Sequence, residues 1–318
     1  MSNLCASIDI GTNTLRLLIA ETHNKKLQPF FLQRIITRLG GDYKEDIGIS
    51  PAAEERTINA LGIFAEKIKE YGIKEIKAVA TSVVRRAKNK KKFLKNVLEK
   101  TGLNVRVITG DEEARLSLLG VLSVIGNGNK KYLVVDIGGG STEFIKVNAG
   151  KMIGAWSMEM GVVHLTENYL KTDLPTHNEL DAMENEINGT IEDLKGLIKK
   201  DDFLSSAVFV GTAGTITTLA AIDMGLEKYN PEKINNYILS CRAVKEIYRH
   251  LASLSLKQRE QVLSLEKGRE DIIIPGAAIV LKAMEGFGFD KMTVSDAGLL
   301  EGILLDSCKL QKNVVTQS

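Results

Sequence analysis

The sequence has 318 residues, of which 44% are hydrophobic and 26% are charged, a balance that supplies cores for about two domains. Its formal net charge of +2 is too small to favour nucleic acid as a partner, and no apolar run is long enough to cross a membrane. The N-terminus shows no signal-peptide pattern. Three widely spaced cysteines predict free thiols in a reducing cytoplasm, and four scattered histidines argue against a zinc site.

The first half of the chain alternates between apolar, β-branched runs and amphipathic stretches. Three antiparallel strands joined by short turns are predicted first, at 5–10, 15–21 and 27–40. A helix is expected over 50–72, because Ser50 can cap it, Pro51 suits its first turn and Gly72 can end it. Further strands are predicted at 76–81 and 104–109, and further helices at 85–102 and 110–126.

The second half repeats this order after a Gly- and Asn-rich linker at 126–131. Its three-strand meander is predicted at 131–137, 141–147 and 151–159. Helices are expected at 161–170, 177–200, 269–288 and 297–310, with a strand, turn and helix over 205–223 and a strand at 291–296. Residues 232–266 are expected to be helical with loops. The order βββαβαβα, present twice, predicts a duplicated α/β fold with mixed sheets.

This duplication predicts two domains. The first covers 1–125 and the second 126–298, and the closing helix at about 299–314 is expected to pack back on the first domain. The segment near Gly126 to Lys130 is expected to act as a hinge for a phosphate-binding cleft between the two halves.

Two matching turns carry the strongest chemical signal. Asp9 and Asp136 each end an apolar strand and begin a glycine-rich turn that also carries hydroxyl groups. Glycine exposes backbone N–H groups, and successive N–H groups with hydroxyls form an anion cradle. The predicted phosphate-binding residues are Gly11, Thr12, Asn13 and Thr14 in the first turn, and Gly138, Gly139, Gly140, Ser141 and Thr142 in the second.

The two aspartates cannot bind an anion themselves, so Asp9 and Asp136 predict a divalent cation or a water bound to one. A single turn of this kind would suit an ordinary hairpin tip equally well. Two matched turns indicate instead that a phosphate chain and its metal are held from both sides.

Three further polar clusters follow strand ends or begin helices, where α/β sheets bind their ligands. Thr81 and Ser82 precede Arg85, which suits a bidentate phosphate contact, although alone this cluster would be an ordinary helix start. Asp111 and Glu112 complement a helix dipole, whereas Glu113 is available as a general base for water. The last cluster precedes a helix N-terminus that can attract phosphate, and consists of Gly211, Thr212, Gly214 and Thr215.

Two features have an ordinary and a functional interpretation. Glu143 lies seven positions after Asp136, in an otherwise apolar strand. A buried carboxylate needs a partner, which would be either a metal ion or an arginine in a salt bridge. The run from Arg85 to Lys100 holds eight Lys or Arg residues. A solvated helix face is slightly favoured for this run over a track that leads polyanions to the cleft.

The ordered set of motifs resembles the exopolyphosphatase/guanosine pentaphosphate phosphohydrolase family. The resemblance covers nearly everything from Ala6 to about Leu305. Its components are DIGTNTLRLLIAE, ATSVVRRA, GDEEARLSLLGV, VVDIGGGSTE, MGVVHLTE, VGTAGT and the closing RED…PGA…VSDAGLLEGIL. Any one of these motifs is weak evidence, whereas the ordered set is highly specific.

The resemblance implies an actin-like, ribonuclease H-like fold of the sugar kinase, heat-shock chaperone and actin superfamily. It implies hydrolysis of a terminal phosphoryl group of inorganic polyphosphate or of guanosine pentaphosphate (pppGpp), with a link to the stringent response. Mg²⁺, for which Mn²⁺ can substitute, would lie between the two aspartate turns. The family's catalytic glutamate falls on Glu113, its basic clamp on Arg85, and its metal-linked acidic positions on Asp136 and Glu143. We also expect a cytoplasmic homodimer with no membrane or nucleic-acid partner.

Two departures from the family pattern stand out. Leu300 occupies a position where the family usually has arginine, so an ion pair is lost and a structural consequence is expected. The chain also ends at Ser318 without the helical domain of longer members, so we expect the short two-domain form and weaker processivity on long polyphosphate. An ATP-dependent small-molecule kinase is less favoured, because Glu113 suits water activation, which a kinase avoids. A non-catalytic nucleotide sensor or an actin-like polymer would not need Glu113.

Overall fold

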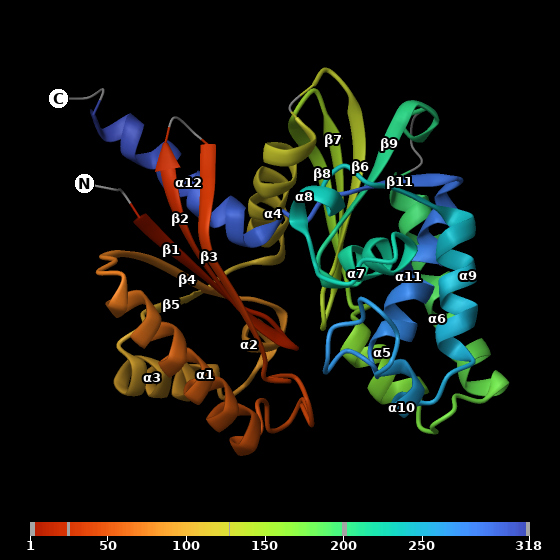
Figure 1. Cartoon of the computed structure of the whole chain (residues 1–318), viewed down its shortest axis with the longest axis horizontal. Helices are drawn as coiled ribbons and strands as arrows, with labels where there is room; N and C mark the ends of the chain where they lie inside the picture. Colours follow the sequence, from red (N-terminus) through yellow and green to blue (C-terminus); the bar gives the residue numbers. More distant parts are fainter. Residues whose placement is uncertain (1–3, 24–25, 127, 199–201, 316–318) are drawn as a thin grey trace. The chain divides into compact units, whose positions relative to one another are not determined.

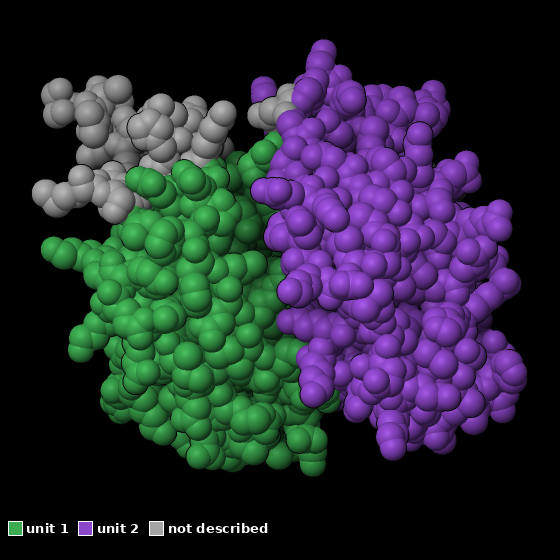
Figure 2. Space-filling view, in the orientation of Figure 1, with its two compact units in different colours: residues 1–123, 297–318 green, residues 124–296 purple. Residues whose placement is uncertain are grey.

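The computed structural model describes residues 4–23, 26–126, 128–198 and 202–315 (Figure 1). The chain divides into two compact units, which Figure 2 shows in different colours. Unit 1 comprises 1–123 with 297–318, and unit 2 comprises 124–296. Within the described ranges, no helix is both long enough and apolar enough to cross a membrane.

Unit 1 is built on a five-stranded mixed sheet of order β3-β2-β1-β4-β5. Its strands are β1 (Leu4–Ile10), β2 (Thr14–His23), β3 (Lys26–Ile36), β4 (Glu75–Ala80) and β5 (Val105–Val107). The first three form an antiparallel meander, and β4 and β5 extend the sheet in parallel from β1. The C-terminal ends of β1, β4 and β5 therefore meet at one edge of the sheet.

Helices cover both faces of this sheet. They are α1 (Pro51–Glu70), α2 (Ser82–Arg86), α3 (Lys90–Thr101), α4 (Gly110–Ile125) and α12 (Leu299–Val315). α1 and α3 lie side by side, and Phe64 and Phe93 pack with Ile8 in the core on their face (Figure 1). The other face receives α12, whose Leu300 and Leu304 join an apolar cluster on β1 and β2. Ser50 caps α1 as expected, by accepting a hydrogen bond from Ala53 N.

Unit 2 is built on a six-stranded mixed sheet of order β10-β11-β9-β6-β7-β8. Its strands are β6 (Lys131–Ile137), β7 (Thr142–Asn148), β8 (Lys151–Met158), β9 (Ala207–Thr212), β10 (Ile238–Ser240) and β11 (Lys291–Val294). β6, β7 and β8 repeat the antiparallel meander, and β9 and β11 continue in parallel from β6. The order β8-β7-β6-β9-β11 corresponds strand for strand to the sheet of unit 1, and β10 is added at the edge. The predicted duplicated α/β fold with mixed sheets is confirmed.

The helices of unit 2 form one large core with this sheet. They are α5 (Val162–Tyr169), α6 (His177–Ile198), α7 (Gly214–Asp223), α8 (Pro231–Ile234), α9 (Cys241–Ala252), α10 (Leu256–Arg259) and α11 (Ile273–Phe287), with a short 3₁₀ turn, η1 (Leu204–Ser206). α11 contacts α6 and α9, and nearly all of its residues are buried. Phe144 and Phe209 of the sheet pack in the same core.

The structure corrects three predicted elements. Residues 232–266 contain a strand as well as helices, because β10 pairs antiparallel with β11. β10 has three residues, too few to show the alternation of apolar and polar residues that predicts a strand. The helix predicted over 85–102 is two helices, since Ala87 is extended and Asn89 binds the backbone of Ile49. The strand predicted over 27–40 ends at Ile36. The next two backbone N–H groups, of Thr37 and Arg38, donate to Asn13 O instead of continuing the strand. Residues 199–200 of the predicted helix 177–200 and residue 127 of the predicted hinge lie outside the described residues.

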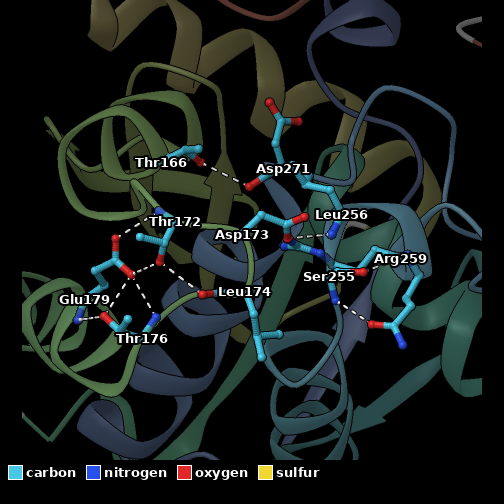
Figure 3. Close-up of polar contacts among 11 residues, drawn as sticks. Thr166, Thr172, Asp173, Leu174, Thr176, Glu179, Ser255, Leu256, Arg259 and Asp271 are labelled. Carbon is cyan, nitrogen blue, oxygen red and sulfur yellow. Dashed lines mark hydrogen bonds and ion pairs between the residues drawn. The ribbon is translucent and has the colours of Figure 1, made fainter.

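One glutamate closes the loop between α5 and α6 (Figure 3). The Glu179 carboxylate accepts hydrogen bonds from Lys171 N at 2.8 Å and Thr176 N at 2.7 Å. It also accepts from Thr172 N at 3.0 Å and from the hydroxyls of Thr172 and Thr176. These bonds, first the one from the Thr172 hydroxyl, lower the pKa of Glu179 from its ordinary 4.5 to about 2.

We expect Glu179→Gln to lower the melting temperature by a few degrees at pH 7, because an amide offers one acceptor oxygen where the carboxylate offers two. The depressed pKa means that this stabilisation is present above pH 4.5 and is lost as the pH falls toward about 2. Thermal unfolding of both proteins at pH 7 and at pH 3.5 should therefore show a smaller difference at the lower pH. Glu192→Gln, a change at an exposed ion pair on the same helix, is the control and should have little effect. An equal difference at both pH values would contradict this assignment.

Candidate active site

Three loops of unit 1 that carry predicted site residues lie side by side at the C-terminal edge of the sheet. Ile10 pairs with Ala80, and Ala80 pairs with Val107, so the chain leaves β1, β4 and β5 at neighbouring points. Thr81 N donates to Ile10 O at 3.2 Å, and Ile108 N donates to Ala80 O at 3.1 Å. Ligands of α/β sheets bind at such strand ends.

The turn after β1 is closed by its own backbone. Gly11 N donates to Thr14 O at 3.1 Å, and a Cβ atom on Gly11 would lie 3.0 Å from that same oxygen. The turn is also fixed from outside, because Gly40 N donates to Thr12 O at 2.8 Å. Thr12 and Asn13 are buried. This is a rigid, hydroxyl-bearing turn of the kind that phosphate cradles use, and its ligand role stays a prediction.

Arg85 and Glu113, predicted separately, form an ion pair at this edge. Arg85 Nη1 lies 3.0 Å from Glu113 Oε2 and also donates to Ile108 O at 2.9 Å. The Glu113 side chain is 13% exposed and that of Arg85 is 26% exposed, so both can be reached from solvent. Thr81 and Ser82, at the start of the same short helix as Arg85, are buried. A carboxylate and a guanidinium thus lie at the same edge of the sheet as the turn that follows β1.

Asp9 is already paired within unit 1. Its Oδ2 accepts from Arg16 Nη2 at 2.6 Å and from Arg16 Nε at 3.0 Å, across the β1–β2 pair. Its Oδ1 is buried and accepts no hydrogen bond from the described residues. A buried carboxylate oxygen of this kind keeps its lone pairs available to accept a hydrogen bond from a water or a ligand hydroxyl.

The turn after β6 in unit 2 has the same backbone geometry. Gly138 N donates to Ser141 O at 2.9 Å, and a Cβ atom on Gly138 would lie 3.0 Å from that oxygen. The start of α5 closes over it, since Val163 N donates to Gly139 O at 2.9 Å. A Cβ atom on Gly161 would lie 2.4 Å from Gly139 O, so only glycine allows this close approach.

Asp136 and Glu143 are directly opposed in the β6–β7 register, so their side chains share one face of the sheet. Glu143 is 3% exposed. Its Oε1 accepts hydrogen bonds from the Ser141 hydroxyl at 2.7 Å and the Ser157 hydroxyl at 2.8 Å. Asp136 is half-buried. Two adjacent carboxylates repel each other, and a hard divalent cation with oxygen ligands relieves that repulsion.

The turn after β9 lies next to this pair, because Thr212 pairs with Asp136 in the β6–β9 register. α7 begins at Gly214, after Ala213 with a φ of +75°, a conformation that is uncommon for residues with a Cβ. Thr212 and Thr215 are buried. The Arg269 guanidinium packs on Gly214, where a Cβ atom would lie 2.0 Å from its Nη1, and Arg269 also pairs with Glu266 at 2.9 Å.

The structure thus brings the predicted residues together in two groups. The group in unit 1 contains the first turn, Thr81, Ser82, Arg85 and Glu113, and the group in unit 2 contains the second turn, Asp136, Glu143 and the turn 211–215. Within the described part of the chain, no cluster of three or more His, Cys, Asp or Glu side chains forms a metal site.

Three residues near these groups were not predicted. Arg16 could have been found by aligning the two turns, because it stands where the second turn has Glu143. Arg269 begins the RED motif, but nothing in the sequence pairs it with Gly214. Ser157 lies on β8, and only the sheet register brings it to Glu143.

A family model described as the Ppx/GppA phosphatase family matches residues 18–311. The chain belongs to this family. It is 31% identical over 313 residues to exopolyphosphatase 2 of Mycobacterium tuberculosis, a match that covers 94% of this chain and 97% of that protein. It is also 30% identical over 306 residues to the guanosine-5'-triphosphate,3'-diphosphate pyrophosphatase of Aliivibrio fischeri, which covers 95% of this chain and 59% of the relative.

Solved structures agree with this membership. The Ppx/GppA family member of Aquifex aeolicus has a TM-score of 0.81 and 34% identity, over 98% of both chains. An exopolyphosphatase of Cytophaga hutchinsonii has a TM-score of 0.87 and 26% identity, over 96% of this chain and 98% of that one. The predicted family and its duplicated α/β fold are confirmed, and the phosphatase family confirms the predicted class of reaction, phosphoryl hydrolysis. A kinase or a non-catalytic sensor is correspondingly disfavoured.

Leu300, the departure from the family pattern, lies in an apolar environment. It is 2% exposed and packs with Cys5, Leu18, Ala20 and Leu304. Its carbonyl oxygen accepts a hydrogen bond from the Ser7 hydroxyl at 3.0 Å. An apolar residue here anchors α12 on β1 by burial, where an arginine would need a buried partner.

Proposed function

We propose that this protein is a metal-dependent phosphohydrolase that releases the terminal phosphate from inorganic polyphosphate, from pppGpp, or from both. The observation that carries the proposal is the Glu113–Arg85 pair at 3.0 Å, at the same edge of the sheet as the hydroxyl-bearing turn after β1. An exopolyphosphatase and a pppGpp pyrophosphatase are among its relatives. Both of those reactions break a phosphoanhydride bond with water.

In this proposal Glu113 takes a proton from the attacking water, and Arg85 neutralises the charge that develops on the phosphoryl oxygens. The ion pair serves both roles before substrate arrives. It fixes the position of the Glu113 carboxylate, and it orients the guanidinium with the help of the Ile108 carbonyl. The turn Gly11 to Thr14 offers N–H groups and hydroxyls to the neighbouring phosphates.

Asp136 and Glu143 fit Mg²⁺ or Mn²⁺. Their carboxylates are opposed on one sheet face, Glu143 is nearly fully buried, and two hydroxyls hold its orientation. Mg²⁺ commonly uses one or two carboxylates and fills its other positions with water and phosphate oxygens. When bound, the cation would neutralise charge on the phosphate chain. The predicted contribution of Asp9 is restricted by its pairing with Arg16, which leaves only Oδ1 for a water or a ligand hydroxyl.

We also propose that the protein is cytoplasmic. Cys5 and Cys241 are free thiols, as a reducing cytoplasm favours. If pppGpp is a substrate, the protein acts in the stringent response. The predicted homodimer, without a membrane or nucleic-acid partner, stays a prediction that sedimentation of the purified chain can check.

The deciding experiment is phosphate release by purified protein from short polyphosphate, long polyphosphate and pppGpp side by side. Each assay is run with Mg²⁺ and again after chelation with EDTA. The proposal is supported if phosphate is released from at least one of these substrates and if this release requires Mg²⁺ or Mn²⁺. Full activity after exhaustive chelation would exclude the metal role, and ADP formation from ATP only with an added acceptor would indicate a kinase.

The basic run has one structural member and several exposed ones. Lys90 Nζ donates to Arg85 O at 2.9 Å, so it supports the helix that carries Arg85. Lys88, Lys91 and Lys92 are exposed. They are the candidates for a track that binds the distal phosphates of a long chain, since exposed cations attract polyanions without fixed geometry.

We expect the triple variant Lys88→Ser, Lys91→Ser, Lys92→Ser to raise KM for long polyphosphate roughly 3- to 150-fold, at about 0.2–1 kcal/mol per exposed charge pair. KM for pppGpp should change much less. The difference should shrink at high salt, because exposed charges are screened beyond about 8 Å at physiological ionic strength. Lys228→Ser, Lys233→Ser, Lys257→Ser removes the same charge from exposed positions in unit 2 and is the control. If KM changes equally for both substrates, or for neither, the basic run is an ordinary solvated helix face and not a polyphosphate track.

A further inference from the structure

The two turns match in backbone geometry but differ in charge at one position. In each, the aspartate is the next-to-last residue of a strand, and the N–H of the glycine two residues later donates to a carbonyl three residues further on. In each, the aspartate is directly opposed to the residue seven positions later, on the next strand. That opposed residue is Arg16 in unit 1 and Glu143 in unit 2. The duplication therefore placed a cation and an anion at equivalent sites.

This exchange changes what each site can bind. In unit 1 the Arg16 guanidinium lies 2.6 Å from Asp9 Oδ2 and compensates the charge of an aspartate that is only 4% exposed. In unit 2 two carboxylates share the equivalent place, which favours a divalent cation. A metal ion near Asp9 would be repelled by Arg16, because like charges in a poorly solvated site interact strongly.

We propose that Arg16 is the resident cation of the first turn and takes the place that a divalent metal takes at the second. The chain then binds one divalent cation, through Asp136 and Glu143. Asp9 is a positioning residue that holds Arg16, not a metal ligand. This inference rests on the proposed function in one respect, the divalent cation at Asp136 and Glu143.

The remaining oxygen of Asp9 agrees with this assignment. Oδ1 is buried and has no hydrogen-bond partner among the described residues. A single carboxylate oxygen next to a guanidinium is a poor ligand for a dication, but it is a good acceptor for a neutral donor such as water or a hydroxyl. The Asp9 site therefore suits a hydrogen bond to substrate or solvent.

Mn²⁺ binding to the full chain, measured by isothermal titration calorimetry and by the loss of the free-ion signal in electron paramagnetic resonance, tests the inference without an activity assay. The wild-type protein should bind one Mn²⁺. Asp136→Asn and Glu143→Gln should each weaken that binding by more than tenfold, roughly the effect of removing a charged ligand (about 1.4 kcal/mol or more). Asp9→Asn should leave the Mn²⁺ affinity within about threefold of wild type. Arg16→Glu should add a second Mn²⁺ site, because it recreates the opposed carboxylates of unit 2.

The outcomes separate this inference from the proposed function. If Asp9→Asn abolishes Mn²⁺ binding, the inference is overturned but the metal role stands. The same holds if the wild-type protein binds two Mn²⁺ ions. No Mn²⁺ binding by the wild-type protein would overturn both. Circular dichroism will show whether Arg16→Glu folds. If it does not, the comparison of Asp9→Asn with Asp136→Asn still tests the inference, because each change replaces one carboxylate with an amide of the same shape.

Discussion

Glu113→Gln is expected to lower kcat by about 10²–10⁴-fold while substrate affinity stays roughly unchanged. Glutamine keeps the size of the side chain and can still accept the hydrogen bond that Arg85 Nη1 donates at 3.0 Å. It cannot take a proton from water. The variant therefore isolates the general-base role from the positioning of Arg85.

Measurements of kcat, KM and equilibrium substrate binding are needed together, because kcat alone would not separate chemistry from binding. Glu112→Gln is the matched control. Glu112 occupies the same helical turn but pairs with Arg106 at 2.6 Å, so its removal should leave kcat near normal. A near-normal kcat for Glu113→Gln would mean that Glu113 serves only the helix dipole and Arg85.

Gly302→Ala is expected to destabilise unit 1 strongly. A Cβ atom at Gly302 would lie 1.7 Å from Leu116 O, and one at Gly120 would lie 1.9 Å from Gly298 O. These are backbone atoms of α4 and the segment around α12, so neither can move without shifting a helix. Overpacking of this kind costs about 1–3 kcal/mol or more and outweighs the gain of about 1 kcal/mol in helix propensity.

The measurement is the urea midpoint of unfolding, with Gly62→Ala as the control. Gly62 lies inside α1, and a Cβ atom there would meet nothing within 4 Å. Alanine at that position should therefore stabilise the protein by about 0.5–1 kcal/mol. A Gly302→Ala variant as stable as wild type would show that α4 and α12 can separate freely.

α4 also carries Glu113. We therefore expect any Gly302→Ala protein that folds to have a lower kcat than wild type.

Much of the fold could be predicted from local sequence. Ser50 and Pro51 begin α1 where capping chemistry places its start, and apolar alternation places the two meanders. Helix breaks and short edge strands could not be predicted. β10 exists because β11 supplies its hydrogen bonds, and α2 and α3 are separate because Asn89 binds Ile49, 40 residues away. Contacts so distant in sequence leave no local periodicity.

Local sequence was sufficient to identify the two turns, their repetition, and the residue types that suit phosphate chemistry. These are local properties, since glycine, hydroxyl and carboxylate side chains at strand ends act over a few residues. Which charged side chains lie next to one another depends on strand pairing and packing. The register of β1 with β2 pairs Asp9 with Arg16, whereas the register of β6 with β7 opposes Asp136 to Glu143. The parallel alignment of β4 and β5 brings Arg85 to Glu113, 28 residues later in the chain. Electrostatic roles depend on distance in space, so the strand registers decide which charges interact at each turn and, we infer, which ligand each turn binds.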